Sequence, residues 1–226
     1  MQEFQPVRFQ ILPPVVKNLL IINGIFFVAT LVLGNTFGIN LSRIFGLHYF
    51  ASDLFKPWQI ITYMFMHSTT DFGHIFFNMF ALWMFGSAIE NVWGGKRFLL
   101  YYLITGIGAA VLHYLIVTYQ IHYVWNLTDF QYYFAINQFN IVGASGAVFG
   151  ILLAFGMMFP NSMIYIYFLF PMKAKWFVII YGALELIYGV AGSNDGIAHF
   201  AHLGGMLFGL ILILLWKKKG NIHRFN

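Results

Sequence analysis

The sequence of 226 residues contains no cysteine, and only 8% of its residues are charged. Without cysteine the chain has no disulfide, no thiol nucleophile and no thiolate metal ligand. Soluble domains carry about one quarter charged residues, so this low charge, together with 60% hydrophobic residues, indicates a membrane protein. Any nucleophile in it must therefore be an oxygen or a nitrogen atom.

The sequence also lacks a dense basic patch of the kind that binds nucleic acid. Its formal net charge is +5, but lysine and arginine are dispersed between apolar runs and cluster only at Lys217, Lys218 and Lys219. Basic residues dispersed in this way indicate how the chain is oriented in a membrane. We therefore expect a lipid bilayer as a partner and no nucleic acid.

Six apolar runs account for most of the chain. They cover approximately residues 18–37, 72–92, 98–117, 144–159, 173–191 and 198–216. Most of them approach the ~20 residues that cross ~30 Å of hydrocarbon as an α-helix. The sequence therefore predicts an all-α, polytopic membrane protein with six transmembrane helices in one domain, residues 18–216.

The basic residues indicate an orientation for this bundle. Only Arg43 and Lys56 lie in loops on one side of it, so ten of the 12 basic residues fall on the other side. Lysine and arginine concentrate in cytoplasmic loops, so we expect an integral protein of the plasma (inner) membrane with both termini in the cytoplasm. Residues 1–17 then form a cytoplasmic segment without a cleaved signal peptide, and residues 217–226 a cytoplasmic basic tail. The loops that face outward are 38–71, 118–143 and 192–197.

Two segments depart from a simple bundle. The loop 38–71 is long and aromatic, which is typical of a structured element in the membrane interface. The fourth run is short, because about 16 residues form a helix of ~24 Å, less than the ~30 Å hydrocarbon core. Its outer end, where Ser145 lies, is therefore expected inside the membrane, in a pocket that water reaches.

Few polar side chains interrupt the apolar runs, and such residues mark function in membrane proteins. They are His74, Asn78, His113, Ser145, Glu185, His199 and His202. Ser145 is the candidate nucleophile, and histidine is the usual base that activates a serine. His199 and His202 are three residues apart and point to similar faces of one helix, so spacing alone does not choose between them as the base.

Acyl transfer also needs hydrogen-bond donors for the developing oxyanion. The backbone N–H of Ser145, at the positive end of its helix, is one such donor. His74 and Asn78 are four residues apart, so they share a helix face and are candidates for two more. Phe149 lies one turn after the serine. We expect its ring to stack on the imidazole of the base and to fix its orientation without a third, acidic residue.

Glycines at four-residue spacing follow both candidate catalytic positions. Gly146 and Gly150 follow the serine, and Gly205 and Gly209 follow the second of the two histidines. Small residues at this spacing let membrane helices approach closely. We therefore expect the fourth and sixth helices to touch along these faces.

Each of these features alone is more often structural than catalytic. A serine in a small-residue motif usually serves packing, and a single buried histidine or asparagine usually serves a hydrogen bond between helices. The convergence of four polar groups at one outer layer, from three helices, favours chemistry: His74, Asn78, Ser145 and His202. His113 and Glu185 are interpreted as structural, with Glu185 bonded to a neighbouring helix.

At these residues the sequence closely resembles the rhomboid family of intramembrane serine proteases, over approximately residues 58–216. The matching motifs are His74-Ile-Phe-Phe-Asn78, Glu90 with Gly94-Gly95-Lys96, Gly143-Ala-Ser145-Gly146, and Ala198-His199-Phe-Ala-His202-Leu-Gly204-Gly205 running into Gly209. The resemblance implies a six-helix core fold with an interfacial first loop. It also implies a Ser–His dyad that cleaves transmembrane-anchored proteins at or near the outer membrane face, with water and without a metal or cofactor.

The resemblance also implies a role for each matching residue. Ser145 is the nucleophile, and His202 is the base because it begins the family's His-x-x-Gly-x-x-x-Gly pattern, whereas His199 falls outside that register. His74 and Asn78 match the oxyanion-stabilising residues of the family. The ring of the orienting phenylalanine stands where the family often has tyrosine, and the fifth helix resembles the family's mobile element for substrate access.

Three other interpretations stay open. One is a catalytically silent rhomboid-like protein that binds membrane clients. Another is a metal site formed by four histidines, His67, His74, His199 and His202, although no His-Glu-x-x-His motif supports it. Of these, His67 resembles an upstream loop histidine of the family. The third is a transporter built on Glu185 and His113, which lacks the repeated broken helices of that class. The substrate and the oligomeric state do not follow from the sequence.

Overall fold

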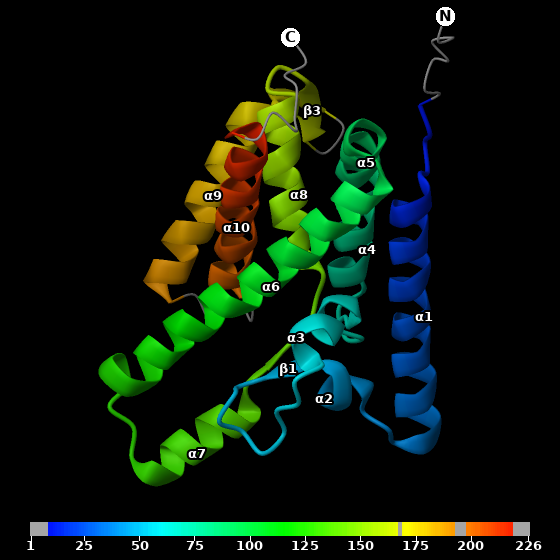
Figure 1. The fold of residues 1–226 in the computed structure, drawn as a ribbon. Coiled ribbons are helices and arrows are strands. Elements are labelled where there is room, and N and C mark those ends of the chain that lie inside the picture. The colour runs from blue at the N-terminus through cyan, green and yellow to red at the C-terminus, as the bar shows by residue number, and fades with distance from the viewer. Residues whose placement is uncertain (1–8, 167–168, 193–197, 219–226) are drawn as a thin grey trace, which may run out of the picture.

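The computed structural model describes residues 9–166, 169–192 and 198–218, mostly as helices (Figure 1). Within these ranges, five helical segments are long and apolar enough to cross a membrane: Pro14–Phe37, Phe72–Trp93, Gly95–Val124, Ala174–Ala191 and His199–Lys218. A sixth apolar helix, Ser145–Met158, is shorter. The chain is therefore an all-α, polytopic membrane protein, as its sequence predicts.

The helices follow the predicted runs closely. The first is α1 (Pro14–Phe37), and the second segment joins α4 (Phe72–Ala81) to α5 (Ser87–Trp93) through a π-helical stretch, Leu82–Gly86. The third is α6 (Gly95–Tyr119), which continues as a π-helical stretch, Gln120–Val124. The last three are α8 (Ser145–Met158), α9 (Ala174–Ala191) and α10 (His199–Lys218). With 14 residues, α8 is only ~21 Å long, so it is the short fourth helix that the sequence predicts.

Three helices form the centre of the bundle. α6 runs obliquely across it and packs against both α8 and α10, which also pack on each other (Figure 1). α9 lies at one edge against α10 and α8, and α1 lies at the opposite edge beside α5. Only 17% of the most apolar stretch of α9 is buried within the protein, compared with 44% for the segment that begins with α6. α9 is thus the most peripheral of the five long segments.

Glycine allows α8 and α10 to approach closely. A methyl group at Gly205 would overlap the carbonyl oxygen of Gly146, so the two backbones are in direct contact. This contact follows directly after the serine of α8 and the second histidine of α10. The expectation that the fourth and sixth helices touch there is confirmed.

The second glycine of each pair has a different neighbour. A side chain at Gly150 would collide with Thr105, and one at Gly209 would collide with Tyr101, and both of these residues belong to α6. The hydroxyl of Tyr101 also donates to the carbonyl of Gly150 at 2.8 Å. α8 and α10 therefore pack on each other, as expected, while α6 packs against the second glycine of each pair.

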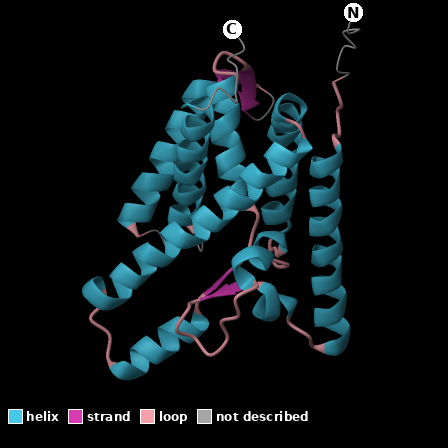
Figure 2. Cartoon of the chain, viewed as in Figure 1, coloured by secondary structure: helices cyan, strands magenta, loops and turns pink. Residues whose placement is uncertain are grey.

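The loop 38–71 is structured, as its aromatic content predicts. It contains α2 (Leu41–Phe45), β1 (Leu47–His48), α3 (Gln59–Thr62) and a 3₁₀ turn at Tyr63–Phe65. β1 pairs antiparallel with β2 (Asn140–Ile141), as the magenta ribbon in the lower half of Figure 2 shows. A second ribbon, β3 (Met163–Ile166) with β4 (Phe170–Lys173), lies at the other end of the bundle. The first loop is thus tied to the segment that leads into α8.

Further hydrogen bonds fix the chain just before α8. The N–H of Gly143 donates to the carbonyl of Tyr63 at 3.0 Å, and the hydroxyl of Tyr63 donates to the carbonyl of Gly106 at 2.7 Å. The helix α7 (Asp129–Gln138) is held nearby, where Ser52 donates to Asn137 at 2.7 Å. The first loop, α6 and α7 therefore together set the position at which α8 begins.

A buried carboxylate holds the start of α1. The two oxygens of Glu90, in α5, accept hydrogen bonds from the backbone N–H groups of Val15 and Val16 at 2.9 and 2.8 Å. These N–H groups lie in the first turn of a helix, where no carbonyl of the helix itself is available to them. Glu90 is only 4% exposed, so its charge is compensated by the helix terminus that it caps.

The described ends of the chain lie on one side of the bundle. The start of α1 and the end of α10 are at the same end, near β3 and the junction of α5 with α6 (Figure 1). Basic residues of these elements include Lys17, Lys96, Arg97, Lys173 and Lys175, in line with the predicted one-sided distribution. Which side of the membrane this is stays a prediction. Most of the predicted outer loop 192–197, segment 1–8 and tail 219–226 lie outside the described residues.

Candidate active site

A serine and a histidine from different helices meet where α8 and α10 touch. The Nε2 atom of His202 lies 2.9 Å from the Oγ atom of Ser145. Ser145 is the first residue of α8, and His202 lies in the first turn of α10. This distance allows the serine hydroxyl to donate to a neutral imidazole, which is the arrangement that a base needs in order to take its proton.

A carboxylate lies behind the histidine. The Oε2 atom of Glu185, in α9, is 2.8 Å from Nδ1 of His202 and 2.7 Å from Nδ1 of His199. Because a carboxylate only accepts hydrogen bonds, both histidines donate to it from Nδ1. The exposed fractions of the three residues are 5%, 7% and 6%. In a neutral imidazole that donates from Nδ1, Nε2 is the acceptor nitrogen, and in His202 this atom faces the serine.

This carboxylate corrects one expectation from the sequence. Glu185 bonds to a neighbouring helix, as expected, but the expectation that no acid orients the base is wrong, because His202 donates to it. His199, the competing base, bonds to the same oxygen, and no hydrogen bond joins it to Ser145 among the described residues. Two histidines three residues apart in one predicted span, together with a carboxylate in the middle of the preceding span, were the signal in the sequence for this contact.

Phe149 lies where the sequence places it. Its ring stacks on the imidazole of His202, with centroids 4.2 Å apart and an angle of 5° between the planes. On its other side it stacks on Tyr181 of α9, at 5.1 Å and 30°. The histidine is thus held between an aromatic face and a carboxylate.

The two candidate oxyanion residues lie on α4. The side-chain amide of Asn78 donates to the carbonyl of His74 at 2.8 Å, and Nδ1 of His74 lies 3.4 Å from the backbone N–H of Ser68. Neither side chain hydrogen-bonds to Ser145 in the described part of the chain. Gly143 lies between His74 and Ser145, and its φ of +131° favours glycine. A Cβ atom at Gly143 would lie 2.8 Å from Nε2 of His74 and 3.6 Å from Oγ of Ser145, so both groups border the same small space.

Two other histidines, His67 and His113, make no hydrogen bond to Ser145 among the described residues. The ring of His67 is buried and lies 5.2 Å from that of His74. Burial, and next the proximity of His74, lowers the pKa of His67 to about 3, so its ring is neutral at physiological pH. His113 lies on α6 with its ring 5.4 Å from that of Phe139.

The four histidines of the metal hypothesis do not form one group. Among the described residues, the cluster with metal-ligand atoms within 4.8 Å of one another is Glu185, His199 and His202. His67 and His74 do not belong to it. The separations of 2.7 and 2.8 Å in the cluster are those of hydrogen bonds to one shared oxygen.

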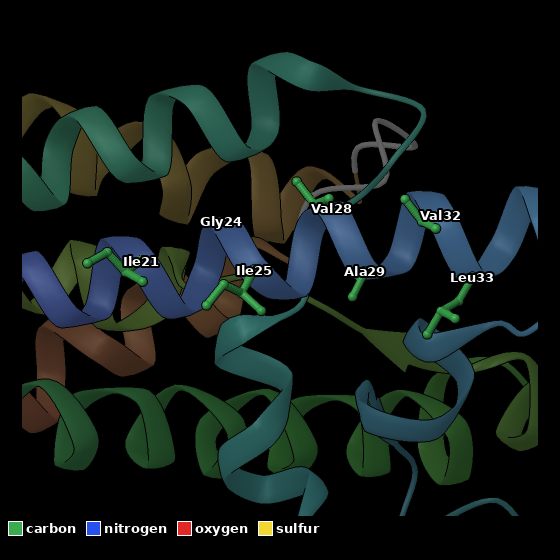
Figure 3. Close-up of a pocket in the computed structure, with 7 residues that line it drawn as sticks. All are labelled: Ile21, Gly24, Ile25, Val28, Ala29, Val32 and Leu33. Carbon is green, nitrogen blue, oxygen red and sulfur yellow. The ribbon is translucent and has the colours of Figure 1, made fainter.

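A shallow apolar depression lies on α1. It has a volume of about 680 Å³ and is lined by Ile21, Gly24, Ile25, Val28, Ala29, Val32 and Leu33 (Figure 3). All seven come from one helix, and none has a polar side chain. This surface can contact lipid chains, but it offers no group for catalysis.

Comparison with known proteins gives one family match and several relatives of similar sequence. Residues 54–219 match the rhomboid domain. The chain is 29% identical over 206 residues to Rhomboid-like protein 11, chloroplastic, of Arabidopsis thaliana, and the aligned region covers 87% of this chain and 66% of that protein. It is 30% identical over 154 residues to Rhomboid protease GluP of Bacillus subtilis, with coverages of 67% and 24%. It is 29% identical over 184 residues to Rhomboid protease AarA of Providencia stuartii, with coverages of 76% and 61%. The chain thus spans less than two thirds of the length of each of these relatives.

Proposed function

The chain belongs to the rhomboid family, and from this membership we propose that it is an intramembrane serine endopeptidase that cleaves transmembrane-anchored proteins. Two of its relatives are themselves named rhomboid proteases. The observation that carries the proposal is the 2.9 Å separation between Ser145 Oγ and His202 Nε2. It supplies a nucleophile together with the base that activates it.

Acylation begins at the serine. Oγ of Ser145 attacks the carbonyl carbon of the scissile peptide while its proton passes to Nε2 of His202. The tetrahedral intermediate then collapses, the C–N bond breaks, and His202 returns the proton to the leaving amine. The products of this half-reaction are an acyl-serine and the freed amino-terminal end of the second fragment.

Deacylation repeats the same steps with water. His202 takes a proton from a water molecule as the water oxygen attacks the ester carbonyl, and it then protonates Oγ of Ser145 as the ester bond breaks. The reaction needs no group beyond the side chains and water. The short α8 supports it, because a helix of ~21 Å leaves its serine end below one membrane surface, where a cavity can admit water.

Oxyanion stabilisation is assigned to three donors. The backbone N–H of Ser145 lies at the start of α8, where helix N–H groups have no partner within the helix. His74 and Asn78 supply the other two: both are on α4, and His74 borders the same space beside Gly143 as Oγ of Ser145. One such donor contributes on the order of 3 kcal/mol to catalysis.

The setting in the membrane completes the proposal. Residues 18–216 form the membrane domain, with residues 1–17 and the basic tail 217–226 in the cytoplasm of a plasma (inner) membrane. The cleavage site is at or near the outer face, because the end of α8 that carries Ser145 is the end nearer to that face. Transmembrane segments of substrates reach it beside α9, the least buried of the long segments.

The test is cleavage of a reporter protein with a transmembrane anchor by the purified chain in detergent and in liposomes. We expect cleavage by the wild type and a loss of at least about 10³-fold in Ser145→Ala and His202→Ala. Labelling by a fluorophosphonate, which forms a bond only with an activated serine, should occur in the wild type and disappear in both variants. Full cleavage by folded Ser145→Ala would overturn the mechanism.

The alternative function is a catalytically silent protein that binds membrane clients. It predicts that the folded wild type neither reacts with the fluorophosphonate nor cleaves any anchored reporter, yet retains a client in a pull-down. The intact pair of serine and histidine favours the protease.

A further inference from the structure

We propose that Glu185 and His199 extend the serine–histidine pair into a four-residue chain, in which Glu185 positions His202 and His199 positions Glu185. The proposal rests on the proposed protease function. It goes beyond the dyad that the family resemblance implies, because it assigns to an acid on α9 the orientation of the base.

The first observation is the sharing of one oxygen by two donors. Oε2 of Glu185 accepts from Nδ1 of His202 at 2.8 Å and from Nδ1 of His199 at 2.7 Å. A carboxylate that is 5% exposed within apolar helices is costly unless it is paired and hydrogen-bonded. The two N–H groups meet this need, so the three residues form one unit.

The second observation concerns the tautomer of His202. A neutral imidazole carries its proton on either nitrogen, and only the form with the proton on Nδ1 can take a proton from the serine at Nε2. The flat stack on Phe149 restrains the tilt of the ring but offers no acceptor to Nδ1. Glu185 offers that acceptor, so it selects the form that serves as a base.

The third observation concerns charge. When His202 takes the proton of Ser145 it becomes an imidazolium, 2.8 Å from a carboxylate that is shielded from water. An opposite charge at this distance stabilises the cation, and the stabilisation is felt mainly in the transition state. Loss of the negative charge should therefore lower kcat rather than raise KM.

His199 holds the carboxylate in place. It lies one turn before His202 on α10, and its ring packs at 5.7 Å from that of Tyr188 on α9. Its hydrogen bond fixes Oε2 of Glu185 at the point where His202 Nδ1 meets it. Among the described residues, no hydrogen bond joins Glu185 or His199 to Ser145, so both act through His202 and are positioning residues.

The main experiment replaces two buried glutamates by glutamine. Glu185→Gln removes the charge at the site, and Glu90→Gln removes an equally buried charge that caps α1 on the opposite side of the bundle. We expect Glu185→Gln to lower kcat by about 10²- to 10⁴-fold with KM unchanged. Glu90→Gln should lower the unfolding temperature but leave kcat unchanged. Equal kcat values for wild type and folded Glu185→Gln would overturn the proposal.

A pair of variants tests His199 in the same way. The side-chain amide of asparagine can place an N–H where Nδ1 of histidine lies, whereas leucine cannot. We expect His199→Asn to retain most of kcat and His199→Leu to lose about 10-fold or more, with the same KM. Equal loss in both variants would show that the ring packs without positioning the carboxylate, and that would overturn this part of the proposal.

A spectroscopic measurement on the wild type is independent of whether any variant folds. In protein labelled with ¹⁵N-histidine, two strongly deshielded protons bonded to Nδ1 are expected, because two imidazoles donate to one buried carboxylate. Both should be present in Glu90→Gln and absent in Glu185→Gln. Their absence from the folded wild type would overturn the proposal.

These results separate the two proposals. If the wild type neither cleaves nor reacts with a fluorophosphonate, the protease function fails, while the Nδ1 resonances still report on the four-residue chain. If the wild type cleaves and Glu185→Gln cleaves equally fast, the protease function stands and the role of Glu185 fails.

Discussion

The imidazole of His202 lies flat on the ring of Phe149, with centroids 4.2 Å apart and planes 5° apart. Phe149 comes from α8, the helix that begins with Ser145, and it is only 7% exposed. The proposed base is therefore aligned by the same helix that carries the proposed nucleophile. A movement between α8 and α10 has to disturb this stack before it separates the pair.

Replacement of the stacking ring should slow the reaction modestly. A stacked aromatic contact contributes about 0.5–1.5 kcal/mol, which corresponds to about 2- to 12-fold in rate when it is lost in the transition state. We expect Phe149→Leu to lower kcat within that range and Phe149→Tyr, which keeps the ring, to retain it. Single-turnover cleavage of a fluorogenic transmembrane reporter measures both. The same kcat in folded Phe149→Leu and wild type would mean that Glu185 alone aligns the base.

The oxyanion role of Asn78 has a matched control in α1. The amides of Asn78 and Asn23 are both buried, and each donates to the carbonyl four residues earlier in its own helix, at 2.8 Å. Loss of an oxyanion donor costs about 10²- to 10³-fold in kcat. We expect that loss in Asn78→Ala, and an unchanged kcat in Asn23→Ala. Similar kcat values for the two variants would remove Asn78 from the oxyanion site.

The contact between α8 and α10 should be sensitive to one methyl group. Gly205→Ala places its Cβ against the carbonyl of Gly146, and overpacking of this kind typically costs about 1–3 kcal/mol. Gly24→Ala, in α1, meets no atom within 4 Å and removes a helix-weakening glycine. We expect thermal unfolding in detergent to begin at a lower temperature in Gly205→Ala, but not in Gly24→Ala. Unfolding of Gly205→Ala at the wild-type temperature would contradict the close packing.

Burial of His67 should make stability depend on pH. Its pKa falls from 6.5 to about 3 in the folded protein, so between these values the unfolded chain binds a proton that the folded chain does not. With respect to this group, the free energy of unfolding is therefore highest above pH 6.5 and decreases as the pH falls toward 3. We expect His67→Phe to weaken the loss of stability between about pH 6.5 and pH 4.5, measured by thermal unfolding in detergent. An unchanged pH dependence would indicate that His67 is not neutral in the folded state.

Much of the fold and part of the site could be predicted from the sequence. Membrane-spanning helices follow from the lengths of apolar runs, and the short α8 follows from the polar residues that flank it. The pairing of α8 with α10 at Gly146 and Gly205 follows from small residues at helical spacing. These features depend on one helix at a time, or on one contact that only small residues permit.

The rest depends on how helices are rotated against each other. Spacing showed that His199 and His202 share a face, but it did not show that this face is turned toward Glu185 on α9. The glycine spacing predicted that α8 and α10 touch, but it did not show that Thr105 and Tyr101 of α6 pack against Gly150 and Gly209. The pairing of β1, in the first loop, with β2 joins residues more than 90 positions apart, and no local pattern in two-residue strands predicts it.

The place of Glu185 on α9 links access to the site with readiness for chemistry. α9 is the least buried of the long segments, whereas the groups that it serves lie on α8 and α10. If α9 moves outward to admit a substrate, the carboxylate moves with it and the base loses its acceptor. In the proposed mechanism, Ser145 then lacks an oriented base while α9 is open, and cleavage follows only after α9 has closed again beside the substrate.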